Sequence, residues 1–155
     1  MADVTPIVRA NARHREMLTG DTLTTVGASG NSLRPGIVML GRLIGANLNS
    51  TADQAIAMGS ASYMVTQIIA TNVSADLSLS LAAGGIYTAA SKGGSAIVAA
   101  SQVYTALTAG TVVMPLTVAL TTTRFTATTT YLSLTTAHGS AATADVYVLG
   151  VAFDG

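Results

Sequence analysis

The sequence contains no cysteine, no tryptophan and few charged residues. Without cysteine there is no disulfide, no thiolate metal site and no cysteine nucleophile. Charged residues make up 9% of the chain, compared with a typical ~25%, and the seven basic and seven acidic side chains cancel. Because little charge repulsion keeps such surfaces apart, we expect neighbouring chains to cover part of the surface. The composition therefore predicts an oligomer.

The sequence also lacks an apolar run long enough for a membrane-spanning helix, which needs ~20 consecutive apolar residues. The best stretch, residues 96–120, is interrupted by several Ser and Thr residues, by Gly110 and by Pro115. Charged residues are scattered through the first 25 positions, which contain no apolar core of a signal peptide. We therefore predict neither a membrane protein nor one secreted by that route.

Ala, Val, Leu and Ile supply most of the apolar content and are mixed with abundant Thr, Ser and Gly. Apolar and polar residues alternate in residues 77–81, 112–120 and 131–135, the pattern of half-buried strands. Pro115 cannot donate to a sheet ladder, so its strand should lie at an edge or carry a bulge. Eight to ten short strands predict an antiparallel β-sandwich or a jelly-roll-like body over residues 51–155.

Two further strands, residues 63–70 and 146–151, are apolar on both faces. Such a strand is covered either within its own fold or by another chain. Its large side chains are therefore candidates for the contacts between subunits. We predict that the oligomer interface contains Tyr63, Val65, Ile69, Tyr147 and Leu149.

Charged residues concentrate in the first 50 residues, which show no sustained hydrophobic period. This segment cannot build a core of its own, so we predict an extended N-terminal arm, residues 1–50, that becomes ordered on a partner. Forty extended residues reach at most ~130 to 140 Å, enough to cross onto a neighbouring subunit. The residues predicted to bind the partner are Arg9, Arg13, His14, Arg15, Asp21, Arg34 and Arg42.

The basic cluster of residues 9–15 is consistent with two kinds of partner. Its arginines suit nucleic-acid phosphates, but no aromatic residues lie between them, and Glu16 and Asp21 are close by. Arginine also forms two-pronged hydrogen bonds with carboxylates on a protein. The balance of charge favours a protein partner, so we predict no nucleic-acid binding.

No catalytic, metal or cofactor site is indicated by the spacing of the reactive residues. Neither His14 nor His138 has a carboxylate at metal-ligand or catalytic-triad spacing. The acidic residues occur singly, so a hydrolase would need folding to bring together a pair such as Asp76 and Asp145. We therefore predict that the chain is not an enzyme and that it holds no metal or cofactor.

Several stretches resemble virion proteins of tailed phages. The segment 10–15 with residues 20–23 resembles the short leader of phage fibre and head-attached proteins, and segments 83–94, 131–136 and 142–148 are similar to small virion proteins. The resemblance implies a particle component, such as a capsid decoration (cement) protein with a β-sandwich or jelly-roll body, often trimeric. It leaves head and tail locations both open and transfers no individual functional residue.

These observations predict a decoration protein on the phage head surface, whose arm binds the major capsid protein lattice while the body forms a homo-oligomer, most simply a trimer. Binding only to the assembled shell would stabilise the head. The alternative is a tail or baseplate adhesin of the fibre type, whose β-domain binds a host surface glycan. The scarcity of aromatic residues argues against the alternative, because glycan sites usually offer aromatic platforms.

Overall fold

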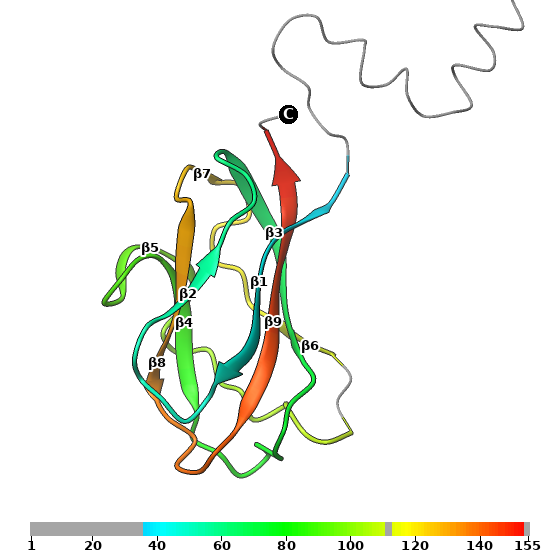
Figure 1. Ribbon diagram of the computed structural model, residues 1–155, viewed down its shortest axis with the longest axis vertical. Coiled ribbons are helices and arrows are strands. Elements are labelled where there is room, and N and C mark those ends of the chain that lie inside the picture. Colours follow the sequence, from blue (N-terminus) through cyan, green and yellow to red (C-terminus); the bar gives the residue numbers. More distant parts are fainter. Residues whose placement is uncertain (1–35, 111–112, 154–155) are drawn as a thin grey trace, which may run out of the picture. The chain divides into compact units, whose positions relative to one another are not determined.

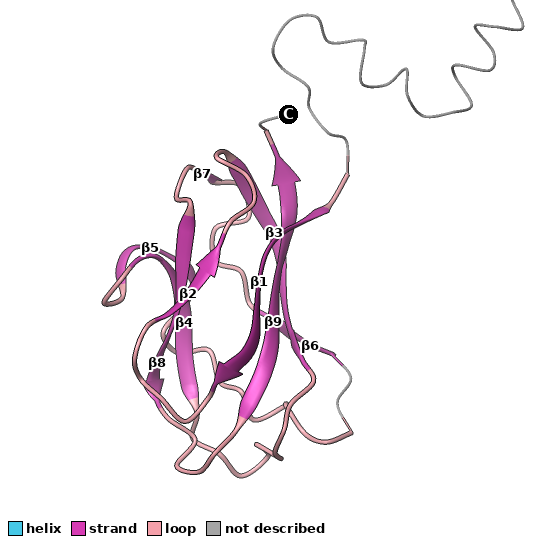
Figure 2. Ribbon diagram, in the orientation of Figure 1, coloured by secondary structure: helices cyan, strands magenta, loops and turns pink. Residues whose placement is uncertain are grey.

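The computed structural model describes residues 36–110 and 113–153 (Figure 1). Throughout these two ranges the regular secondary structure is β-strand, with no helix (Figure 2). The all-β class predicted from composition is therefore confirmed. The strands are β1 (Val38–Asn47), β2 (Gln54–Ala57), β3 (Tyr63–Thr71), β4 (Ala83–Ala89), β5 (Gly93–Val98), β6 (Val113–Leu116), β7 (Arg124–Phe125), β8 (Thr129–Thr136) and β9 (Thr143–Ala152).

The strands form two antiparallel sheets that face each other (Figure 1). Sheet A has the order β1-β9-β3-β6, with the short β7 also paired to β3, and sheet B has the order β2-β8-β4-β5. The pairs are nested along the chain, because β1 pairs with β9, β2 with β8, β3 with β6, and β4 with β5. This nesting is the jelly-roll form of the β-sandwich. Pro115 lies in β6 at the edge of sheet A, as its missing N–H requires.

The hydrophobic core fills the space between the two sheets. Alternate residues of each strand point into it, as the period of two requires. Sheet A contributes Tyr63, Val65 and Ile68 from β3, and sheet B contributes Leu132 and Leu134 from β8; all five are fully buried. The core therefore depends on pairings between distant parts of the chain.

The boundary predicted at residue 50 is wrong, because the sandwich begins with β1. Val38 pairs with Gly150 and Asn47 with Thr143, so β1 is an integral strand of sheet A. The described residues, 36–110 and 113–153, all belong to one compact unit. The reason lies in the apolar side chains of this segment: Leu40 and Ala46 are buried in the shared core, so residues 38–47 fold with the body.

The strand expected at residues 77–81 is also wrong, because this segment forms a turn. The backbone N–H of Ser80 donates to the carbonyl of Leu77 at 2.9 Å, which closes the turn. Leu77 is buried, whereas Leu79 is 98% exposed and Leu81 is 80% exposed. The alternation of leucine and serine here belongs to a turn, in which Leu77 is the buried anchor and Leu79 and Leu81 face solvent.

Tyr63 gives the domain a predicted sensitivity to alkaline pH. Burial raises its pKa to about 12 from the usual 10.0, and its hydroxyl donates to the carbonyl of Ala127 at 2.8 Å. Since the folded protein favours the neutral phenol, this contribution to stability is complete below pH 10 and is lost as pH rises towards 12. The loss should reach about 2 to 3 kcal/mol.

Urea denaturation between about pH 8 and about pH 11 should show about 1 kcal/mol of this loss. Tyr63→Phe should lower stability by about 1 kcal/mol at neutral pH, through the lost hydrogen bond, and should make the alkaline decline less steep. Tyr104, whose pKa burial also raises, remains in this variant and keeps its own part of the decline. An equally steep decline in Tyr63→Phe would contradict the prediction.

Candidate assembly face

The side of sheet A that faces away from sheet B, here called the outer face, carries mainly apolar side chains. Antiparallel sandwiches usually present polar residues on such a face. Met39 is 54% exposed and Val113 is 47% exposed, and the other large apolar residues on the face, except the exposed Pro115, are partly buried. The described residues of the outer face are Met39, Arg42, Met64, Gln67, Ile69, Thr71, Val113, Pro115, Arg124, Asp145, Tyr147, Leu149 and Val151.

Strand register aligns these residues into rows that cross the sheet. One row runs from Arg42 through Tyr147 and Ile69 to Pro115. Directly paired residues lie about 4.5 to 5.5 Å apart between Cβ atoms, so neighbours in a row touch. The apolar side chains therefore form one continuous patch over four strands. A patch of this kind usually marks an interaction surface.

The exposed charges on the outer face are positive. Arg42 lies in β1, an edge strand, and Arg124 in β7 beside Met64. The Nε of Arg124 donates to the hydroxyl of Ser62, and its guanidinium lies 5.4 Å from the ring centre of Phe153. The carboxylate among the described residues of this face, Asp145, is 8% exposed, and both of its oxygens accept hydrogen bonds from its own chain. The face therefore suits a partner surface that is apolar and carries negative charge.

The structure separates the five predicted interface residues into two groups. Ile69, Tyr147 and Leu149 lie on the outer face, where they remain available to a partner. Tyr63 and Val65 are fully buried in the core of their own chain, so their prediction as interface residues is wrong. The physical reason is the alternation of β3, which turns these two side chains towards sheet B.

Other members of the outer face were missed by the sequence interpretation. Met39, Met64 and Val151 share rows with Ile69, Tyr147 and Leu149 or lie next to them. The signal that identifies them is the phase of each strand: once Tyr63 and Val148 are known to face the core, residues one position away must face outwards. Sequence alone does not fix that phase when both faces are apolar.

The predicted arm residues fall into two sets. Arg42 belongs to β1 and to the outer face, so its place in an extended arm is wrong. The apolar neighbours that bring β1 into sheet A fix it there. The other six lie outside the described residues, and their role in binding a partner stays a prediction: Arg9, Arg13, His14, Arg15, Asp21 and Arg34.

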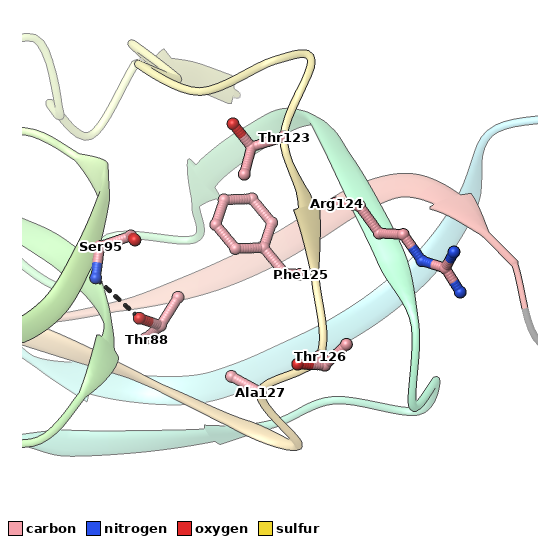
Figure 3. Close-up of a pocket in the computed structure, with 7 residues that line it drawn as sticks. All are labelled: Thr88, Ser95, Thr123, Arg124, Phe125, Thr126 and Ala127. Atoms are coloured by element: carbon pink, nitrogen blue, oxygen red, sulfur yellow. Dashed lines mark hydrogen bonds between the residues drawn. The ribbon is translucent and has the colours of Figure 1, made fainter.

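A hollow of about 300 Å³ lies beside β7 and the β4–β5 hairpin (Figure 3). Hydroxyl side chains line it, from Thr88, Ser95, Thr123 and Thr126. Figure 3 shows the ring of Phe125 among these side chains, while Arg124 points away from them. Since Phe125 is 5% exposed, it offers no free platform on which a sugar ring could stack.

The carboxylate of Asp145 holds the ends of β1 and β3 in place. One oxygen accepts from the backbone N–H of Gly45 at 2.8 Å, and the other accepts from the side-chain amide of Asn72 at 2.9 Å. Gly45 and Asn72 both have left-handed backbones, with φ of 65° and 51°. The carboxylate thus stabilises two unfavourable conformations, a structural task.

Two other carboxylates also brace loops. The hydroxyl of Ser133 and the backbone N–H of Ser91 donate to Asp53 and lower the pKa of its carboxyl group. The backbone N–H of Ser78 donates to Asp76 at 2.8 Å. Asp53 thus joins its loop to the β4–β5 turn and to β8, while Asp76 fixes its own loop. The hydrolase hypothesis built on Asp76 and Asp145 gains no support from their contacts.

The remaining reactive groups are few. The backbone N–H of His138 donates to the carbonyl of Leu48, while its Nδ1 is buried and has no hydrogen-bond partner among the described residues. Residues 36–110 and 113–153 contain no group of three His, Asp or Glu side chains able to hold a metal ion. In the same part of the chain no helix has the length and apolarity that a membrane crossing needs.

Comparison with known proteins leaves the chain without a relative. No protein-family model matches it, and neither a curated protein nor a solved structure is significantly similar to it. The class defined by the structure is thus a jelly-roll β-sandwich with an apolar outer face, and function must be argued from that face.

Proposed function

We propose that the chain is a structural protein of a virus particle, a capsid decoration protein that binds the assembled shell and associates with copies of itself. The N-terminal segment would contact the major capsid protein, and the sandwich would form the homo-oligomer, most simply a trimer, on the head surface. The proposal needs no cofactor and no catalytic residue.

The observation that carries the proposal is the apolar outer face of sheet A. Tyr147, Leu149 and Ile69 stand side by side there, and nothing in the described part of the chain covers them. A face of this size left in water would favour aggregation unless a partner covers it. An assembly protein supplies that partner, since its subunits work in contact with each other.

Two further observations support a particle as the setting. Jelly-roll sandwiches occur in viral capsid proteins and in lectins, an analogy at the level of fold. The resemblance of segments 83–94, 131–136 and 142–148 to small virion proteins adds the phage context. The mechanism is linkage: a protein that binds only the assembled shell stabilises it in proportion to the logarithm of its free concentration.

Binding to shells tests the proposal directly. Shells are purified from a phage whose gene for this chain has been deleted, and the full-length protein is titrated onto them. We expect saturable co-sedimentation and a higher temperature of shell disruption, because binding stabilises the assembled form. Absence of binding, together with unchanged heat resistance, would overturn the proposal.

The second candidate function is a tail or baseplate adhesin, favoured by the hydroxyl-lined hollow of Figure 3. Hydroxyl groups of Thr123 and Thr126 can hydrogen-bond a sugar, although no exposed aromatic ring is present to stack on it. Binding of the natural protein on a glycan array that is lost in Thr126→Val, together with no binding of the natural protein to shells, would favour this function over decoration.

A further inference from the structure

The loop between β3 and β4, residues 72–82 and here called the leucine loop, exposes two leucines almost completely. Leu79 is 98% exposed and Leu81 is 80% exposed. Residues so apolar rarely face water together unless a partner covers them. Since their side chains touch little of their own chain, the leucines contribute almost nothing to its fold. The described part of the chain therefore leaves both leucines open to a partner.

The leucine loop holds this geometry through its own hydrogen bonds. Leu77 is buried and its N–H donates to the carbonyl of Leu107 at 2.9 Å. Ser80 is 6% exposed, and its hydroxyl oxygen accepts from the N–H of Ala82 at 2.9 Å. A loop fixed in this way loses little entropy on binding. A rigid loop of this kind suits a protein surface of complementary shape better than a fluid membrane surface.

The leucine loop also carries a negative charge. Asp76 is exposed, and hydrogen bonds from the backbone and then the side chain of Ser78 lower the pKa of its carboxyl group. No Lys or Arg occurs between residues 72 and 82. An anionic lipid surface attracts basic segments, so this loop is poorly suited to one.

The outer face of sheet A has the complementary properties. It is mainly apolar and its exposed charges are Arg42 and Arg124, whereas Asp145 is 8% exposed and bound to its own chain. Packing two outer faces against each other would bring arginines of two copies together with no exposed carboxylate between them, which is unfavourable. Packing the leucine loop on the outer face instead brings Asp76 towards an arginine and covers both apolar features at once.

We propose that the leucine loop of one copy packs on the outer face of sheet A of the next copy. The inference rests on the self-association in the proposed function and specifies its geometry. Because the two surfaces differ, the contact is heterologous: repeated around an axis it closes a ring, and a trimer is the smallest such ring. Shell binding through the N-terminal segment is independent of it.

Two variants and their mixture test this geometry. The loop variant is Leu79→Asp with Leu81→Asp, and the face variant is Tyr147→Asp with Leu149→Asp. Each alone should associate at least about thirtyfold more weakly than the natural chain, the loss expected at an interface hot spot. Mixed in equal amounts they should form a one-to-one dimer, since each retains the surface that the other lacks. Analytical ultracentrifugation measures all three samples.

A second test, which does not depend on the folding of the face variant, exchanges two opposite charges at exposed positions. Arg42→Asp and Asp76→Arg are both at exposed positions, and each should weaken association. The double variant Arg42→Asp/Asp76→Arg should recover it, because the opposite charges meet again between copies. Ala90→Asp, at an exposed position in the β4–β5 turn of sheet B, is the control and should associate normally.

The other outcomes overturn the inference in distinguishable ways. If the face variant dissociates and the loop variant does not, copies pair face to face, and self-association stands while the loop contact fails. If the natural chain is a monomer, self-association fails as well. If the natural chain co-sediments with phosphatidylcholine–phosphatidylglycerol vesicles and the loop variant does not, the loop binds lipid and the inference is wrong.

Discussion

Gly150→Ala is expected to destabilise the domain by about 3 kcal/mol or more, the cost of overpacking where backbone must move. Gly150 lies in β9 between β1 and β3, paired with Val38 and with Val65. A Cβ atom there would stand 1.9 Å from the carbonyl oxygen of Met64. Since that oxygen belongs to the neighbouring strand, no side-chain rotation relieves the clash. Sheet A would have to separate locally.

Gly59→Ala is the matched control for this substitution. The nearest atom to a Cβ at Gly59 is the carbonyl oxygen of Leu40 at 3.6 Å, an ordinary contact. There alanine should be neutral or stabilise by about 0.4 to 1 kcal/mol, because it restricts the unfolded chain. Urea denaturation of both variants gives the difference. Equal stabilities would show that β9 and β3 are farther apart than described.

Leu132→Ala is expected to cost about 2 to 5 kcal/mol, because it leaves a cavity between the two sheets. Leu132 is fully buried in β8 and pairs with Ile86 and Gln54 of the two flanking strands. Strands on both sides hold the backbone, so the surroundings have little freedom to collapse into the space. Thermal or urea unfolding measures the loss.

Leu79→Ala makes the same chemical change at a position that is 98% exposed. It should alter the stability of the isolated domain by less than about 0.5 kcal/mol, as surface substitutions usually do. The pair of leucines therefore distinguishes the turn seen at residues 77–81 from the strand that alternation predicts. A large loss of stability in Leu79→Ala would show that residues 77–81 form the strand that the alternation predicts.

Much of the fold follows from the sequence because most alternating apolar and polar residues belong to half-buried strands. Leu132 and Leu134, which alternate with polar neighbours, are both core residues of β8. Pro115 marks an edge strand for a reason intrinsic to proline. The segment 77–81 failed because alternating leucine and serine also fits a turn, and the hydrogen bonds of Asp76 and Ser80 favour the turn.

The outer face of sheet A was predictable only in part. The sequence shows that residues 63–70 and 146–151 have two apolar faces, and from this an interface follows. It does not show which face meets sheet B, so Tyr63 and Val65 were placed wrongly, whereas Ile69 and Tyr147 face outwards and their role at an interface stays a prediction. The positions of Arg42 and Arg124 on that face depend on register between distant strands, which no local pattern encodes.

The nested pairing also governs how the chain can fold. Asp145 lies 100 residues from Gly45, the partner that it fixes, and β9 separates β1 from β3 in sheet A. During synthesis β1 and β3 must wait, with unpaired edges, until β9 emerges. Such high contact order implies folding in milliseconds to seconds rather than microseconds. Nascent chains crowded on one messenger are therefore at risk of exchanging β9, and slower translation would not remove that risk.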